Sequence, residues 1–159
     1  MEIKRRYCLN KKEIKKLKEE INNIFGVDII PTKGNIEVAI TDNYEMILFN
    51  NEPLAFKINN KVYPTLKTIL KHNLDKNKVI VDMGALRFIA NGADVMAPGI
   101  VNANEEIKKD DIVFVADETH NKPLCVGIAL MDGKEMKESN KGKAIKTIHY
   151  IGDEVWNFK

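Results

Sequence analysis

The chain has 159 residues, of which 44% are hydrophobic and 30% charged, and its formal net charge is +2. This length suits one domain or two small ones, with enough apolar side chains for a core. There is no run of 18 apolar residues and no signal-peptide pattern, which argues against membrane insertion and secretion. Cys8 and Cys125 lie far apart and outside any Cys-x-x-Cys motif, so we expect reduced, packed thiols in a cytoplasmic protein.

The small net charge conceals a difference between the two parts of the chain. Residues 1–76 contain 14 Lys and Arg against 10 Asp and Glu, a net +4, whereas residues 77–159 contain 11 against 13, a net −2. Neither part is basic enough to bind nucleic acid through charge alone, because such binding requires several phosphates to be neutralised together. RNA affinity would therefore depend on a local patch.

Two basic stretches are candidates for such a patch. The first comprises Lys4, Arg5 and Arg6 with Lys11, Lys12, Lys15, Lys16 and Lys18, and a solvated helix face also explains it. The second comprises Lys141, Lys143 and Lys146, to which folding could add Arg87.

Residues 1–76 predict a small α+β domain. Asn10 and Glu13 have the spacing of a capping box, and apolar side chains then recur at helical spacing until Gly26. Pro64 is expected to open a second helix. Between the helices, short apolar runs bounded by turn residues predict strands, which need a helix to cover their apolar face. These strands are expected at 27–30, 35–40, 45–49, 54–58 and 62–63.

A polar stretch at 73–77 is the best candidate for a boundary, so we predict domains at 1–76 and 77–156. The second domain is expected to be mainly β. Its strands are short and joined by turns such as Asp132-Gly133, a pattern that favours a closed or nearly closed β-barrel. They are predicted at 78–81, 111–116, 124–131 and 145–151.

The most distinctive segment of the chain is 81–100. It predicts a strand end, a short helix, a glycine turn at Gly92, a second short strand and a stop at Pro98-Gly99. Because glycine has no Cβ, Gly92 would let a sugar-phosphate backbone approach closely. A tight turn that needs only a positive φ explains the same glycine equally well. Both hypotheses remain open at this point.

Motifs for catalysis are absent from the sequence. It contains no Gly-x-Gly-x-x-Gly, Walker or Gly-x-Ser-x-Gly motif. His72, His120 and His149 lack metal-ligand spacing to one another or to a cysteine. We therefore expect no metal site and no cofactor. We also expect no enzymatic activity, since catalysis would require a cleft in the first domain that the sequence does not indicate.

A series of motifs runs through residues 77–156. They are Val81-Asp82-x-Gly84-Ala85, the segment 91–100, Cys125-Val126-Gly127, the segment 140–144 and the segment 148–156. In this order they resemble the PUA domain, the RNA-binding module named after pseudouridine synthases and archaeosine transglycosylases. The upstream segment 63–72 extends the similarity to the group of the malignant T-cell amplified sequence protein and ligatin, in which an N-terminal domain precedes a PUA domain.

This resemblance implies a pseudo-barrel that holds structured RNA, often a tRNA-like end, against the short helix and the strand after it. Helix residues would face the RNA, the glycine turn and the following strand would form a groove, and lysines of the last loop would contact phosphates. For Phe88 and Met96, core packing is the competing interpretation. The implied residues are Arg87, Phe88, Asn91, Gly92, Ala93, Met96, Pro98, Gly99, Lys141 and Lys143.

The resemblance also implies action on the small ribosomal subunit, in initiation or in recycling, together with a partner that carries an initiation-factor-like domain. Since the chain ends soon after the PUA-like segment, we expect that partner to be a separate protein. The resulting hypothesis is a non-catalytic protein that binds tRNA or small-subunit rRNA. The alternative is an accessory subunit that presents RNA to a modification enzyme such as a pseudouridine synthase or a transglycosylase.

Overall fold

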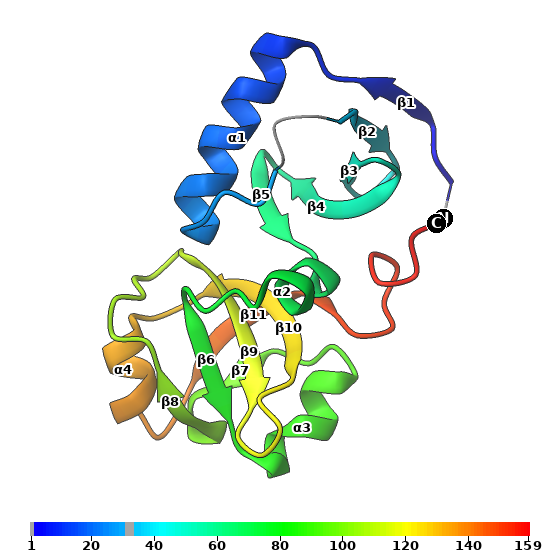
Figure 1. The fold of residues 1–159 in the computed structure, drawn as a ribbon. Coiled ribbons are helices and arrows are strands. Elements are labelled where there is room, and N and C mark those ends of the chain that lie inside the picture. The colour runs from blue at the N-terminus through cyan, green and yellow to red at the C-terminus, as the bar shows by residue number, and fades with distance from the viewer. Residues whose placement is uncertain (1, 31–33) are drawn as a thin grey trace. The chain divides into compact units, whose positions relative to one another are not determined.

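The computed structural model of the protein describes residues 2–30 and 34–159. The chain divides into two compact units, one formed by Met1–Leu74 with Phe158–Lys159 and the other by Asp75–Asn157. Each unit has a sheet of its own (Figure 1). Within the described ranges, no helix combines the length and apolarity needed to cross a membrane.

The first unit is a five-stranded antiparallel sheet with strand order β1-β2-β3-β4-β5. A helix precedes β2 and another follows β5, and the longer one, α1, packs Leu17, Ile21 and Phe25 into an apolar core with strand residues such as Ile47. The elements are β1 Arg5–Cys8, α1 Lys11–Phe25, β2 Ile36–Ile40, β3 Glu45–Phe49, β4 Glu52–Ile58, β5 Lys61–Pro64 and α2 Leu66–His72.

Helix α1 begins and ends where the sequence predicts. The Asn10 side chain accepts the N–H of Glu13 at 2.9 Å, and the Glu13 carboxylate accepts the N–H of Asn10 at 3.1 Å, which completes the capping box. Gly26 ends the helix with a φ of 76°. Local side-chain chemistry therefore determines both ends of this helix.

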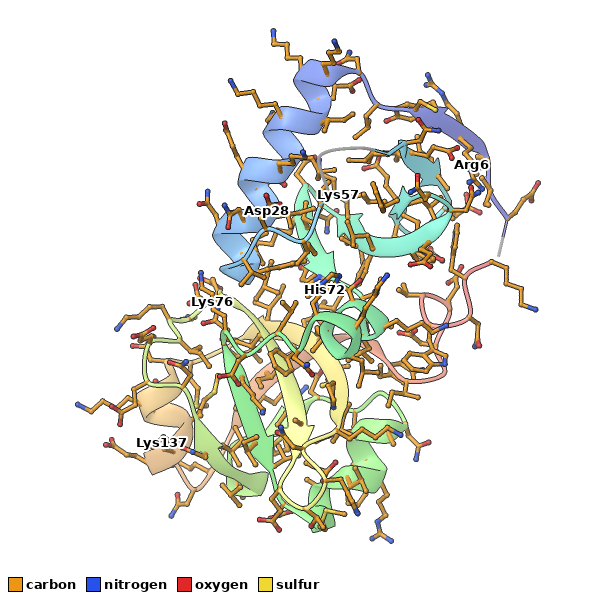
Figure 2. The ribbon with its side chains drawn as sticks, in the orientation of Figure 1. Arg6, Asp28, Lys57, His72, Lys76 and Lys137 are labelled. Atoms are coloured by element: carbon orange, nitrogen blue, oxygen red, sulfur yellow. The ribbon has the colours of Figure 1, made fainter. Side chains whose placement is uncertain are left out.

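Three features of the first unit differ from the sequence-based expectation. Residues 27–30 form no strand, although Ile29 and Ile30 are buried in the core. Arg5–Cys8, for which the sequence predicts no strand, forms the edge strand β1. Arg6 of this strand (Figure 2), a residue of the first basic stretch, has its Nε 2.7 Å from Glu37 Oε2. Pro64 ends β5 rather than opening α2, because Thr65 is the residue that caps the helix.

The second unit is a six-stranded sheet with order β7-β11-β10-β9-β6-β8, in which β6 and β9 are parallel and all other neighbours antiparallel. The sheet curls around a core that includes Val81, Val115 and Ile145 (Figure 1). The elements are β6 Lys78–Val81, α3 Met83–Ala90, β7 Val95–Met96, the 3-10 helix η1 Ala97–Gly99, β8 Ile100–Ala103, β9 Ile112–Asp117, β10 Pro123–Ala129, α4 Gly133–Glu138 and β11 Lys143–Tyr150.

Three elements of this unit were not predicted, namely η1, β8 and α4. The expected stop at Pro98-Gly99 is η1, and strand β8 follows it directly. The expected turn at Asp132-Gly133 opens helix α4 instead. A Cβ at Gly133 would lie 2.1 Å from the carbonyl oxygen of Asn104, so this glycine allows two backbone segments to pack closely rather than a chain reversal.

Asp153 fixes the chain after β11. Its carboxylate lies 2.9 Å from Nδ1 of the fully buried His149 and accepts the backbone N–H groups of Tyr150 and Trp156. Burial acts to raise the pKa of this carboxyl, but the hydrogen bond and charge of His149 with the two N–H groups outweigh it and lower the pKa below its usual value. These contacts hold Tyr150 in place at the end of β11.

The two cysteines differ in their surroundings. Cys125 is fully buried in the core of the second unit, as expected, and burial raises its pKa to about 12. Cys8 is exposed on β1, so the expectation of a packed thiol is wrong there, because its strand lies at the edge of the sheet. Thiolates rather than thiols are the reactive species, so the two side chains should react at very different rates.

We expect dithionitrobenzoate to titrate one thiol of the folded protein at mildly alkaline pH and both thiols after unfolding in guanidinium. The Cys8→Ser variant should lose the fast reaction of the folded protein. It should retain the reaction of Cys125, whose thiol is exposed only by unfolding. Rapid labelling of both cysteines in the folded protein would contradict the burial of Cys125.

Candidate nucleic-acid interface

A groove of about 600 Å³ lies on the second unit. Helix α3 provides one wall, the segment from Ala93 to Gly99 provides the other, and the first residue of β11 lies at its mouth. The lining residues are Asp82, Gly84, Ala85, Phe88, Ile89, Ala93, Asp94, Met96, Pro98, Gly99 and Lys143.

Backbone contacts place the first turn of α3 against η1. Asp82 caps α3, since its Oδ1 accepts the N–H of Ala85 at 2.9 Å. The N–H of the same Asp82 donates to the carbonyl of Gly99, also at 2.9 Å. A Cβ at Gly99 would lie 3.0 Å from the Cβ of Ala85, so a glycine there keeps the two walls close.

A second set of backbone contacts joins η1 and β7 to the start of β11. Met96 lies opposite Lys143 in the ladder, and Val95 lies opposite Ile145. The N–H of Ala97 donates to the carbonyl of Gly142 at 2.9 Å. Main-chain hydrogen bonds therefore hold the loop before β11, which contains Lys141, beside the groove.

Two large apolar side chains of the groove are exposed to solvent. Phe88 on α3 is 56% exposed and Met96 on β7 is 47% exposed, so core packing, the competing interpretation for both, is wrong. The next helix residue, Ile89, is 2% exposed and faces the core, which leaves Phe88 pointing outward. The guanidinium of Arg87 lies 4.8 Å from the centre of the Phe88 ring. Exposed aromatic rings beside cations are surfaces on which nucleic-acid bases stack.

Two of the three charged groups of the groove, those of Lys143 and Asp94, form an ion pair. Lys143 Nζ lies 3.3 Å from Asp94 Oδ2, and Asp94 Oδ1 accepts the backbone N–H of Thr147 at 3.0 Å. The Thr147 hydroxyl donates to the carbonyl of Ala93 at 2.9 Å. The groove thus carries a lysine and a fixed carboxylate on one side and an exposed aromatic side chain on the other.

The structure brings six of the ten expected residues together in the groove lining, namely Phe88, Ala93, Met96, Pro98, Gly99 and Lys143. Arg87 stands beside the lining, over the Phe88 ring. Asn91 ends α3 and donates from Nδ2 to the carbonyl of Arg87 at 2.9 Å. Lys141 is exposed in the loop before β11 and does not line the groove.

Sequence reasoning missed Asp82 and Asp94 as lining residues. A signal existed for Asp82, because an aspartate between a strand and a helix is a typical N-cap. No local signal marks Asp94, because its partner Thr147 is 53 residues away in sequence.

Gly92 has a φ of 90° and does not line the groove. A Cβ at this position would lie 2.7 Å from the ring of Tyr150. The geometry therefore favours the hypothesis that Gly92 serves a tight turn with a positive φ over the hypothesis that it admits a sugar-phosphate backbone. Gly142 has a similar φ of 92°, but a Cβ there would meet no atom within 4 Å.

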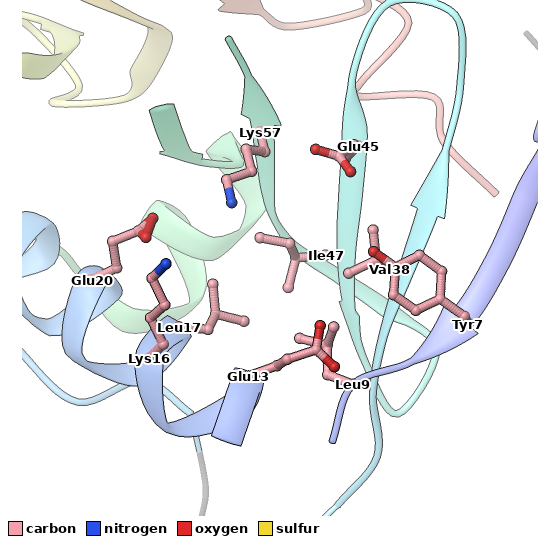
Figure 3. Close-up of a pocket in the computed structure, with 10 residues that line it drawn as sticks. All are labelled: Tyr7, Leu9, Glu13, Lys16, Leu17, Glu20, Val38, Glu45, Ile47 and Lys57. Atoms are coloured by element: carbon pink, nitrogen blue, oxygen red, sulfur yellow. The ribbon is translucent and has the colours of Figure 1, made fainter. Parts of the chain in front are cut away.

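A smaller cavity of about 230 Å³ lies in the first unit, between α1 and the sheet (Figure 3). Its apolar floor includes Leu17 and Ile47, and its charged lining combines three carboxylates with two ammonium groups, namely Glu13, Glu20, Glu45, Lys16 and Lys57. This excess of negative charge does not favour a polyanion. In residues 2–30 and 34–159, no group of three or more His, Cys, Asp or Glu is placed to hold a metal ion.

We predict that Gly92→Ala destabilises the second unit more than Gly142→Ala does. Backbone strain at a positive φ costs about 1–3 kcal/mol at either site. Only Gly92→Ala adds overpacking against Tyr150, which costs a further ~1–3 kcal/mol. Urea unfolding of both variants measures the difference, and equal losses of stability would contradict the packing of Tyr150 on Gly92.

Comparison with known proteins accounts for most of the chain. Residues 77–151 match the family model of the PUA domain, and residues 5–72 match that of a domain of unknown function, DUF1947. A hypothetical protein from Pyrococcus horikoshii has a crystal structure that matches with a TM-score of 0.87 at 41% identity, covering 96% of this chain and 98% of that one. The predicted α+β class with a PUA-type pseudo-barrel is confirmed.

Named relatives extend the match across both units. Translation machinery-associated protein 20 of Schizosaccharomyces pombe is 34% identical over 135 residues, which cover 81% of this chain and 75% of the relative. Malignant T-cell-amplified sequence 1 of Rattus norvegicus is 31% identical over 136 residues, which cover 82% of this chain and 75% of the relative. The chain therefore belongs to the family of PUA-domain proteins that includes these two relatives.

Proposed function

We propose that this protein binds structured RNA, either tRNA or small-subunit rRNA, and acts in translation without catalysing a reaction. The observation that carries the proposal is the groove of the second unit, where Phe88 and Met96 are exposed beside Lys143. The PUA match and the relative named for the translation machinery support the same function. Such a protein would work in the cytoplasm on the small ribosomal subunit, in initiation or recycling, with a separate initiation-factor-like protein as partner.

The chemistry of the groove suits the unpaired part of a structured RNA. A base in a single strand can stack on an exposed ring such as Phe88. A base inside an A-form RNA helix is inaccessible, because the major groove of the RNA is deep and narrow. Lysines position phosphates as point charges without reading the sequence. Because residues 77–159 carry a net charge of −2, affinity should depend on stacking and shape more than on neutralised phosphates.

Within this proposal the ten residues have different roles. Phe88 and Met96 contact bases, and Ala93, Pro98 and Gly99 shape the groove around them. Lys143 contacts a phosphate at the mouth of the groove. The proposed RNA-facing surface is completed by four residues that border the groove, namely Arg87, Asn91, Gly92 and Lys141. We assign residues 77–156 to this RNA-binding domain and residues 1–76 to the domain that precedes it.

We expect Phe88→Ala to weaken binding to total tRNA or to purified small ribosomal subunits by about 5- to 150-fold, since stacking contributes about 1–3 kcal/mol per base. Fluorescence anisotropy of the labelled full-length protein measures the affinity. Val101→Ala is the matched control, because Val101 is an equally exposed apolar residue of the same unit that lies outside the groove. It should leave the affinity unchanged.

Equal losses in Phe88→Ala and Val101→Ala would contradict the assignment of the groove. Absence of binding by the wild-type protein to either RNA would contradict the proposed function itself. Affinity purification from cells distinguishes the alternative role, because recovery of an RNA-modification enzyme in place of ribosomal subunits would indicate an accessory subunit that presents RNA.

A further inference from the structure

We propose that the Asp94 carboxylate is a counter-charge built into the groove. It pairs with Lys143 and thereby excludes the phosphates of generic polyanions. The inference rests on the proposed RNA-binding function and names what sets the selectivity of that site. Its basis is the ion pair between Lys143 Nζ and Asp94 Oδ2, 3.3 Å apart, formed by two residues that both line the groove.

The Asp94 carboxylate is tied in place. Its Oδ1 accepts the backbone N–H of Thr147 at 3.0 Å, and the hydroxyl of the same threonine donates to the carbonyl of Ala93, the residue before Asp94. The Asp94 side chain is 29% exposed, whereas that of Lys143 is 61% exposed. An incoming ligand can therefore draw Lys143 away, but it cannot displace the carboxylate.

The balance of charge in the lining is unfavourable for phosphate. Two carboxylates, those of Asp82 and Asp94, line the groove together with the single ammonium group of Lys143. A phosphate that binds Lys143 competes with Asp94 and is repelled by it at short range. A polyanion that offers only phosphates thus gains little from this groove.

A nucleotide that places its base rather than its phosphate in the groove avoids this repulsion. Its exocyclic amino group can donate a hydrogen bond to Asp94 while its base stacks on Phe88, and its phosphate stays at the outer edge near Lys143. Charge-assisted hydrogen bonds to a carboxylate are strong and directional. Asp94 therefore converts a lysine site into one that selects the orientation of the nucleotide as well as its charge.

The test is the Asp94→Asn variant of the full-length chain, with oligouridylate as a generic single-stranded probe. Asparagine retains an oxygen for the Thr147 N–H but releases Lys143. We expect oligouridylate affinity to rise about two- to fivefold, the range that loss of an exposed ion pair supports. The slope of log affinity against log salt should steepen by about 0.7, as for one additional phosphate contact to a single strand.

Asp75→Asn is the matched control, because it removes the same charge from the same unit and breaks a lysine ion pair outside the groove, that of Asp75 with Lys78. It should leave the affinity and the salt slope unchanged. Equal effects of Asp94→Asn and Asp75→Asn, or weaker oligouridylate binding by Asp94→Asn, would overturn the proposal. If in addition Phe88→Ala still weakens tRNA or subunit binding, the counter-charge alone has failed and the proposed function stands.

A second comparison leaves Asp94 unchanged and so does not depend on the folding of Asp94→Asn. Lys143→Ala removes the ammonium group and leaves the carboxylate uncompensated, whereas Lys141→Ala removes a lysine of the preceding loop that lies outside the lining. Lys143→Ala should lower oligouridylate affinity more than Lys141→Ala does. Equal losses in the two variants would contradict the counter-charge.

Discussion

The pairing of β7 with β11 is the constraint on which the groove depends. Only Val95 and Met96 belong to β7, yet their ladder places Met96 opposite Lys143, and the Ala97 N–H bond to Gly142 extends the contact. Lys143 and Asp94 are 49 residues apart in sequence and meet because of this register. This short run of main-chain hydrogen bonds brings the lysine and the carboxylate together, and the bond from the Asp82 N–H to the Gly99 carbonyl holds the α3 wall against the same segment.

The groove combines an exposed apolar surface with a lining of two carboxylates and a single ammonium group, which carries no net positive charge. Exposed Phe88 and Met96 are costly to leave in water unless a ligand covers them, whereas the single lysine of the lining is already paired. This composition differs from that of a site that gathers phosphates by electrostatics. It suits a protein that must choose one RNA surface among many, since steep electrostatic attraction acts on every nucleic acid alike.

Local chemistry explains what the sequence could predict. The capping box at Asn10 and the αL end at Gly26 define α1 without help from the rest of the chain. Exposure of Phe88 was not predictable, because an apolar residue at helical spacing can equally belong to the core, and only the packing of Ile89 decides which side faces inward. Residues 27–30 pattern as a strand but lie outside the β1-β2-β3-β4-β5 sheet, and Ile29 and Ile30 pack into the core beneath it instead. These outcomes depend on contacts between distant segments.

The most direct test is ultraviolet crosslinking of the full-length protein in cells, followed by identification of both the attached RNA and the crosslinked peptides. We expect small-subunit rRNA or tRNA attached to peptides from residues 83–99 and 141–147, which contain the groove wall formed by α3 and the lysine at its mouth. Crosslinks confined to residues 5–72, or spread over all cellular RNA classes without preference, would contradict the proposal.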